Sequence, residues 1–192
     1  MRQPLAFALT LAAGVVTLAS VGWLAYRVFE HSRMATAGIP SSVSSSRQGE
    51  IGQAAADAVM QWVLPDLEGG QQGLGQWRGK VLVVNFWASW CAPCVEEMPS
   101  FSRLHERYAG QGVQFVGVGM DDTDNLRAFL RNRPVSYPVL VMAPAGVDTP
   151  ALPINGLPLT LVIDRDGRLD MSRLGRLDEA RLESVLRRLL AP

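Results

Sequence analysis

The most informative shortage in this 192-residue chain is cysteine, of which it has only two, Cys91 and Cys94. Two cysteines cannot build a scaffold held by several disulfides, nor a four-cysteine zinc site. Positive charge is not in excess either, because 18 Lys and Arg residues balance 18 Asp and Glu residues. This balance argues against a nucleic-acid partner, whose phosphates select a basic surface.

Charged residues are also few, at 19% of the chain against 48% hydrophobic residues. Such a composition is too apolar for a disordered protein and is sufficient for a sizeable core. The length predicts one domain with room for an appendage.

The segment from Gln3 to Tyr26 has 24 residues and no charge. As a helix it would extend roughly 36 Å, which exceeds the hydrocarbon core of a bilayer at about 30 Å. Trp23 lies near its far end, where aromatic rings favour the membrane interface. We therefore expect a transmembrane helix over about residues 4–26, within an N-terminal anchor and juxtamembrane segment of residues 1–37.

A cleaved signal peptide is the alternative, because residues 35–37 read Ala-Thr-Ala, a small-x-small pattern. The apolar region of a signal peptide usually has about 7–15 residues, and its cleavage site follows closely. Here the apolar run is longer, and Arg27, Glu30 and Arg33 stand between it and the pattern. An uncleaved anchor is favoured. Basic residues flank the run on both sides, so they do not set its orientation.

A flexible linker is predicted over residues 38–49, which are small, polar and rich in serine. Residues 50–192 then alternate apolar runs typical of buried strands with stretches of helical periodicity. The predicted strands are 81–87, 113–118, 137–142, 159–163 and 168–173, and the predicted helices are about 93–108, a helix beginning near 123, and about 178–190. Together they predict an α/β domain with a mixed central sheet flanked by helices.

The two cysteines lie in the sequence Trp-Cys-Ala-Pro-Cys at residues 90–94, where the predicted strand 81–87 gives way to a helix. Free N–H groups at a helix N-terminus stabilise negative charge, and the thiolate is the reactive form of cysteine. We therefore predict a redox pair with an activated first cysteine. A zinc site would need His31 and His105 as well, and a purely structural disulfide would gain little stability from so short a loop.

Residues 80–99, KVLVVNFWASWCAPCVEEMP, together with the late run GLPLTLVIDRDG at residues 156–167, are similar to the TlpA-like, membrane-anchored thioredoxin-fold oxidoreductases. The resemblance extends over roughly residues 60–190 and also includes residues 112–117 and 137–139. It implies a thioredoxin fold for residues 50–192 and thiol–disulfide exchange as the activity.

The resemblance also assigns roles at the site. Cys91 would be the exposed nucleophile and Cys94 the buried resolving thiol, which together form the redox-active disulfide. Pro158 matches the family's cis-proline, and Pro158 and Leu157 are expected to contact substrate. Trp90, which precedes Cys91, is expected either to shield the site and contact substrate or to pack in the core. No cofactor and no metal are expected.

Glu97, three residues after Cys94, matches a glutamate that tunes the proton chemistry of the cysteines in this family. Glu96 is expected to be a solvated neighbour. Asn85 is neutral where cytosolic thioredoxins carry a buried aspartate, which shifts any proton-acceptor role toward Glu97. Pro99 is expected only to bend the helix.

The resulting hypothesis is a single-pass protein of the bacterial inner membrane with its C-terminal domain in the periplasm. It would reduce disulfides in protein substrates and be recharged by a membrane dithiol transporter. Two alternatives remain. A thioredoxin-fold copper metallochaperone typically uses CxxxC plus a distant histidine, and a peroxiredoxin-type peroxidase uses a Pro-x-x-x-Thr-x-x-Cys setting that is absent here.

Overall fold

The computed structural model describes residues 52–142 and 151–191, so the predicted membrane helix and linker lie outside the described residues. Among the helices of the described residues, none is long and apolar enough to cross a membrane. After a short helix over residues 52–59, the elements are β1 (Val63–Pro65), β2 (Gln71–Gly73), η1 (Leu74–Trp77), β3 (Val81–Trp87), α3 (Ala92–Tyr108), η2 (Ala109–Gln111), β4 (Val113–Gly119), α4 (Thr123–Asn132), β5 (Val139–Val141), β6 (Leu159–Ile163), β7 (Leu169–Leu174) and α5 (Glu179–Leu190).

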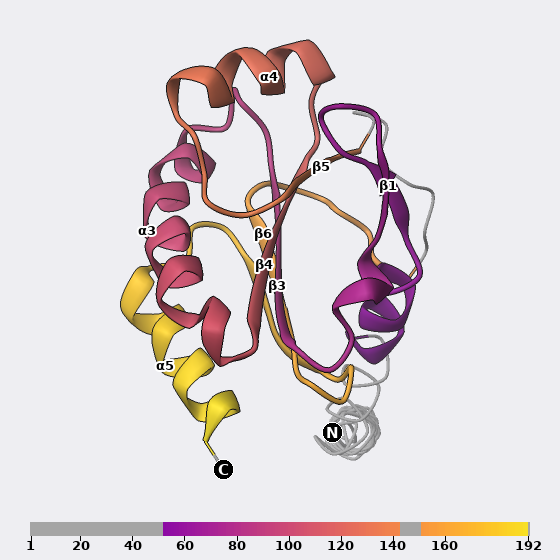
Figure 1. The fold of residues 1–192 in the computed structure, drawn as a ribbon, viewed down its shortest axis with the longest axis vertical. Helices are drawn as coiled ribbons and strands as arrows, with labels where there is room; N and C mark the ends of the chain where they lie inside the picture. The colour runs from indigo at the N-terminus through magenta and orange to yellow at the C-terminus, as the bar shows by residue number, and fades with distance from the viewer. Residues whose placement is uncertain (1–51, 143–150, 192) are drawn as a thin grey trace, which may run out of the picture. The chain divides into compact units, whose positions relative to one another are not determined.

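The central sheet has five strands in the order β5-β4-β3-β6-β7 (Figure 1). β3 pairs with β4 in parallel and with β6 in antiparallel orientation, so the sheet is mixed. All seven residues of β3 are buried, as expected for the continuous apolar run of a central strand. The mixed α/β sheet predicted from the sequence is confirmed.

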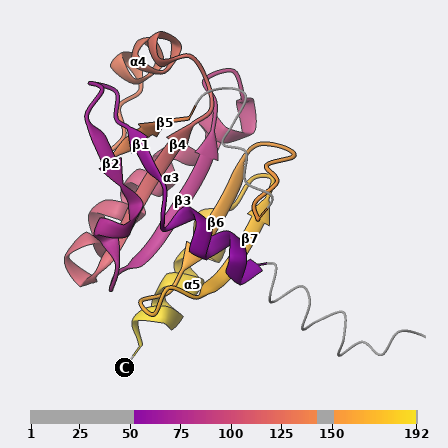
Figure 2. The ribbon, with the colours of Figure 1, turned by 90° about the vertical axis from the view of Figure 1, so that its right-hand side faces the viewer.

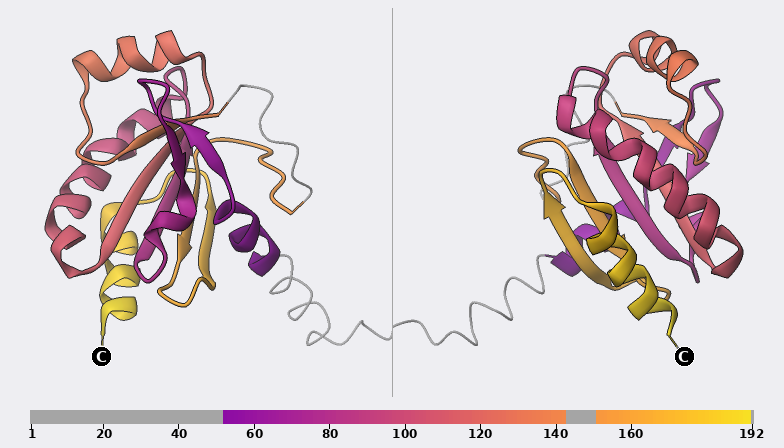
Figure 3. Two further views of the ribbon diagram at one scale, coloured as in Figure 1. Left: turned by 45° about the vertical axis from the view of Figure 1, so that its right-hand side comes forward. Right: turned by 90° about the vertical axis from the view of Figure 1, so that its left-hand side faces the viewer.

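The two faces of the sheet are covered differently. α3 and α5 lie side by side on one face, where Val81 and Val83 of β3 pack against Phe101 and Leu182 (Figure 3). The opposite face packs against the short helix at 52–59 and the β1–β2 hairpin (Figure 2). α4 lies at the end of the sheet where β3 and β4 finish (Figure 1), and its Leu126 contacts the same cluster as the cysteines.

A hydrogen-bonded cluster on Glu183 joins α3 to α5. Glu183 Oε1 accepts bonds from Arg107 (2.7 Å), the Tyr108 hydroxyl (2.7 Å) and Arg187 (2.8 Å). These hydrogen bonds lower the pKa of Glu183 to about 2, and the bond from Tyr108 has the largest effect. The carboxylate therefore stays ionised at neutral pH, and it helps to fix the long helix that follows the cysteines.

The predicted boundaries are close to the observed ones, with two differences. The strand predicted over 137–142 is shorter, because β5 spans only Val139–Val141 and Pro138 has no N–H for a ladder bond. The short helix at 52–59 and the β1–β2 hairpin were not predicted. The hairpin strands have three residues each, too few for a periodic pattern to appear.

Candidate active site

The two cysteines form a disulfide at the end of β3 and the start of α3, with an S–S distance of 2.01 Å and Cα atoms 5.3 Å apart. Cys91 is the N-cap residue of α3, and Pro93 lies in its first turn, as the sequence predicts. Cys91 is 5% exposed and Cys94 is fully buried. Both sulfurs are therefore buried in the oxidised protein, Cys91 slightly less than Cys94, whereas the resemblance predicts an exposed Cys91. The division into attacking and resolving thiol stays a prediction.

Trp90 is the most exposed large hydrophobic residue of the described chain, at 71%. It borders a cavity of about 490 Å³, together with Leu157, Ile154 and Asp121. The structure therefore brings Trp90 and Leu157, two of the predicted substrate contacts, to one hollow. The third, Pro158, is buried and does not line it. Asp121 in its lining is held in place, because its carboxylate accepts hydrogen bonds from the Ser89 hydroxyl and from Asn125 Nδ2.

The Leu157–Pro158 peptide bond is cis, which confirms the bond geometry expected from the resemblance. Pro158 directly precedes β6, whose first residue Leu159 pairs with Phe86 near the end of β3. Pro158 therefore lies at the end of the sheet that carries the cysteines. Its carbonyl accepts a hydrogen bond from Gly175 N at 2.8 Å, which ties the proline to the end of β7.

Glu97 lies on the buried side of α3, one turn beyond Cys94, and it is only 2% exposed. Each of its carboxylate oxygens accepts one hydrogen bond. Asn85 Nδ2 on β3 donates to Oε1 at 2.8 Å, and the backbone N–H of Leu177, just before α5, donates to Oε2 at 2.9 Å. The carboxylate thus joins the sheet, the active-site helix and the C-terminal helix beneath the disulfide.

Burial raises the pKa of Glu97 from its ordinary 4.5 to about 7. The hydrogen bonds from Leu177 and Asn85 and the positive charge of Arg176 act in the opposite direction but are weaker. A carboxyl group with a pKa near neutrality can both accept and release a proton under physiological conditions. Glu97 is therefore suited to exchange a proton with a thiol.

Glu96 behaves as the sequence predicts. Its side chain is 58% exposed and forms an ion pair with Arg176 at 2.8 Å. Pro99 lies inside α3 without ending it, and it leaves the Val95 carbonyl without its helical N–H partner. Neither residue takes part in the buried hydrogen bonds of Glu97 with Asn85 and Leu177.

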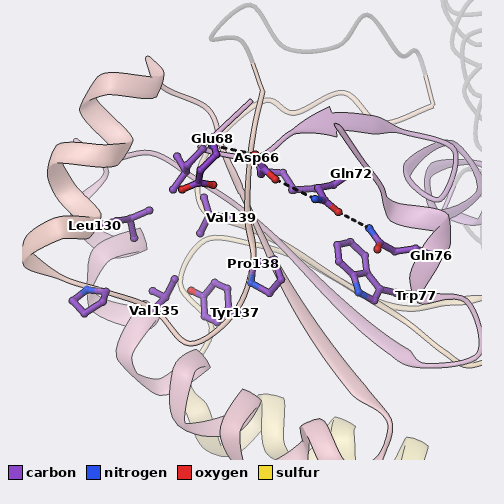
Figure 4. Close-up of a pocket in the computed structure, with 13 residues that line it drawn as sticks. Asp66, Glu68, Gln72, Gln76, Trp77, Leu130, Val135, Tyr137, Pro138 and Val139 are labelled. Carbon is purple, nitrogen blue, oxygen red and sulfur yellow. Dashed lines mark hydrogen bonds between the residues drawn. The ribbon is translucent and has the colours of Figure 1, made fainter. Parts of the chain in front are cut away.

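A larger pocket of about 570 Å³ lies beside β5 and does not include the predicted site residues (Figure 4). Asp66 and Gln72 on its wall are already paired, since Gln72 Nε2 donates to Asp66 Oδ2 at 3.1 Å.

In the described part of the chain, no three His, Cys, Asp or Glu side chains are grouped as metal ligands. His105 lies eleven residues beyond Cys94 on α3, about 16 Å along the helix axis, and contacts Phe115 instead.

Three contributors to the site escaped sequence reasoning. Leu177 acts through its backbone N–H, which no side-chain pattern reveals. Thr160 on β6 accepts a bond from Asn85 Nδ2 at 3.1 Å and is fully buried. Tyr137 is also buried, and its hydroxyl has no hydrogen-bond partner. Burial, followed by the nearby charge of Glu97, raises the pKa of Tyr137, so that its phenol stays neutral.

Comparison with known proteins agrees with this geometry. The model of the AhpC/TSA family matches residues 51–172. The chain belongs to the AhpC/TSA family. It is also 30% identical to the thiol-disulfide oxidoreductase ResA of Bacillus cereus over 147 residues, which are 76% of this chain and 82% of that protein.

Solved structures of thiol:disulfide interchange proteins share the fold. A DsbE-type thiol:disulfide interchange protein of Chlorobium tepidum superimposes with a TM-score of 0.61 at 30% identity, covering 68% of this chain and 93% of that one. The DsbF protein of Mycobacterium tuberculosis gives a TM-score of 0.59 at 25% identity, covering 70% and 98%. The predicted thioredoxin-like fold is confirmed, and the chain is a ResA/DsbE-like thiol–disulfide oxidoreductase with its Cys-x-x-Cys pair at residues 91–94.

Replacing Glu97 by Gln is expected to change how stability depends on pH. The folded protein holds the Glu97 proton up to about pH 7, whereas the unfolded chain releases it near 4.5. The free energy of unfolding of the oxidised protein therefore falls by about 3 kcal/mol as the pH rises through this window. Glu97→Gln lacks this decrease. In urea unfolding, the free energy of unfolding of the variant, relative to that of the unmodified protein, should therefore rise as the pH increases from about 4.5 to about 7.

The exposed neighbour provides a matched control. Glu96→Gln removes a carboxylate from the same turn of α3, but that group is solvated. Its stability profile is expected to run parallel to that of the unmodified protein. Parallel profiles for Glu97→Gln as well would contradict the assignment of a raised pKa to Glu97.

Proposed function

We propose that this protein is a membrane-anchored reductase of protein disulfides that works on the periplasmic side of a bacterial inner membrane. The observation that carries the proposal is the pairing of a Cys91–Cys94 disulfide with a buried carboxylate one turn further along the same helix. The shallow cavity beside Trp90 and Leu157 supplies an apolar surface for a polypeptide substrate.

The exchange proceeds in two balanced steps. The Cys91 thiolate attacks one sulfur of a substrate disulfide, which forms a mixed disulfide and releases the other substrate sulfur as a thiolate. Cys94 then gives up its proton and attacks the Cys91 sulfur, so the second substrate sulfur leaves as a thiolate and the Cys91–Cys94 disulfide closes. The two substrate thiolates take up protons from water. Two electrons pass to the substrate. Glu97 accepts the proton that Cys94 releases, because it is a buried carboxylate one turn beyond that thiol on α3.

The need to reduce the Cys91–Cys94 disulfide again after each turnover gives a reason for the predicted membrane anchor. An oxidised reductase outside the cytoplasm needs two electrons and two protons from a donor, and no soluble reducing pool supplies them there. A dithiol protein within the membrane is the class of donor that fits. A tether of residues 38–49 behind a helix over about residues 4–26 would hold the domain beside such a donor.

Cysteine variants test the chemistry. Cys91→Ser is expected to abolish reduction of insulin disulfides by the reduced protein, because the attacking sulfur is lost. Cys94→Ser is expected to form mixed disulfides that persist, since nothing resolves them, and dithiothreitol should release the trapped substrates. Normal turnover by Cys91→Ser, measured as insulin precipitation, would refute the assignment of the nucleophile.

Fractionation tests the location. The full-length chain is expected to remain with the membrane pellet after an alkaline carbonate wash, and protease added to spheroplasts should digest its domain. Removal of residues 1–37 should release the domain from the membrane while its insulin reduction is retained. Recovery of the full-length chain in the wash, or protection of its domain from the protease, would contradict the proposed anchoring or orientation.

A further inference from the structure

Asn85 has an unequal set of contacts around its side-chain amide. Its Nδ2 donates to both Glu97 Oε1 (2.8 Å) and Thr160 Oγ1 (3.1 Å), whereas its Oδ1 is buried with no hydrogen-bond partner. Asn85 is 1% exposed and Thr160 is fully buried. A buried acceptor without a donor costs free energy, so this arrangement must be offset by what Nδ2 gains.

The gain depends on the charge of Glu97. An ionised carboxylate accepts hydrogen bonds at both oxygens, and bonds to a charged group are stronger than neutral ones. Donation from Asn85 Nδ2 and from Leu177 N therefore suits ionised Glu97. In this state the amide nitrogen faces Glu97, and the unpartnered Oδ1 is tolerated.

Protonation of Glu97 would change which hydrogen bonds its carboxyl group can form. The backbone N–H of Leu177 determines which of the two oxygens carries the proton. The Leu177 N–H is a fixed donor that points at Oε2. An O–H group at Oε2 would oppose this donor, so the proton settles on Oε1, which faces Asn85. There it would meet the N–H of Asn85 unless the amide turns.

The two ends of a side-chain amide have almost the same shape, so the site accommodates the amide turned by about 180°. In the turned orientation Oδ1 lies between Glu97 and Thr160. It then accepts hydrogen bonds from the Glu97 O–H and from the Thr160 hydroxyl, while Nδ2 takes the position without a partner. Each orientation leaves one amide atom unpaired, so the protonation state of Glu97 selects between them.

We propose that Asn85 is a positioning residue whose side-chain amide turns whenever Glu97 gains or loses a proton. This proposal rests on the proposed function. Because the amide turns, Glu97 keeps a hydrogen bond to Asn85 in both protonation states, and its O–H never faces the N–H of Asn85 while a proton is passed. Thr160, the second partner of the amide, is the second residue of β6, the strand that follows Pro158.

The groups that face Glu97 allow it to titrate alone in the oxidised protein. Cys94, on the same helix, is in the disulfide and does not titrate. Tyr137, before β5, stays neutral because burial raises its pKa, and the positive charge of Arg176, before α5, lowers the pKa of Glu97. Asn85 on β3 and Thr160 on β6 carry no charge. His105, about two turns further along α3, contacts Tyr137, and burial lowers the pKa of its imidazole. The carboxyl resonance of Glu97 itself is therefore needed to assign a change in this cluster to Glu97.

Selective labelling of asparagine makes the amide visible. The full-length chain has four asparagines, at positions 85, 125, 132 and 155, so its spectrum contains four asparagine side-chain amides. In oxidised protein at about pH 9, roughly two units above the pKa of Glu97, an NMR cross-peak should connect the Asn85 NH₂ protons to the Thr160 methyl group. At about pH 5 this cross-peak should disappear, with a midpoint equal to that of the Glu97 carboxyl resonance.

Asn132 is the internal control, because its Nδ2 donates to the Ala128 carbonyl, which does not titrate. Its amide resonances should stay constant through the same range. A cross-peak from Asn85 to Thr160 that persists unchanged at both pH values, while the Glu97 carboxyl titrates, would overturn the proposal.

Glu97→Gln supplies an independent arm. The Leu177 N–H requires the carbonyl end of Gln at the Oε2 position, so the amide end of Gln faces Asn85 and donates to it. Asn85 is then held in the turned orientation, and the cross-peak to Thr160 should be absent at every pH. Its presence in this variant would contradict the proposal. Because both arms use oxidised protein and no substrate, a failure here is distinct from a failure to reduce disulfides.

Discussion

The site depends on one buried carboxylate. Glu97 is held between Asn85 of β3 and the backbone of Leu177 ahead of α5, in a layer where the apolar side chains of the sheet and helices exclude water. A charge in such a place is unfavourable, and the compromise between burial and hydrogen bonding brings the pKa of Glu97 to about 7. A carboxyl group that is fully ionised at pH 7 would be a poorer proton donor during recharging, and one that is fully protonated could not accept a proton from Cys94.

The surrounding fold keeps this carboxylate beneath the disulfide. β3 delivers Cys91 to the N-terminus of α3, and the same helix carries Cys94 and Glu97 on its buried side. The contacts of Glu183 with α3 and α5 hold the two helices together, so the Leu177 N–H stays aimed at Glu97. The disulfide and the buried carboxylate are thereby carried by the same helix.

Sequence reasoning recovered the parts that follow a local pattern. The valine-rich run predicted β3, the cysteine spacing predicted the redox pair, and the residues around Pro158 predicted the cis bond through their family resemblance. It missed contacts made by groups without a signature: a backbone N–H eighty residues from Glu97, and a threonine hydroxyl supplied by another strand. Such contacts depend on register and helix packing, which no short window of sequence encodes. The membrane segment lies outside the described residues and stays a prediction.

The most direct test of the account is the pH titration of the Glu97 carboxyl carbon by NMR, compared between the oxidised and the reduced protein. If Glu97 exchanges its proton with the Cys94 thiol, reduction adds a titrating neighbour one helical turn away, and the two groups titrate as a coupled pair. The account predicts a curve that is displaced or biphasic after reduction. Superimposable curves in the two redox states would contradict it.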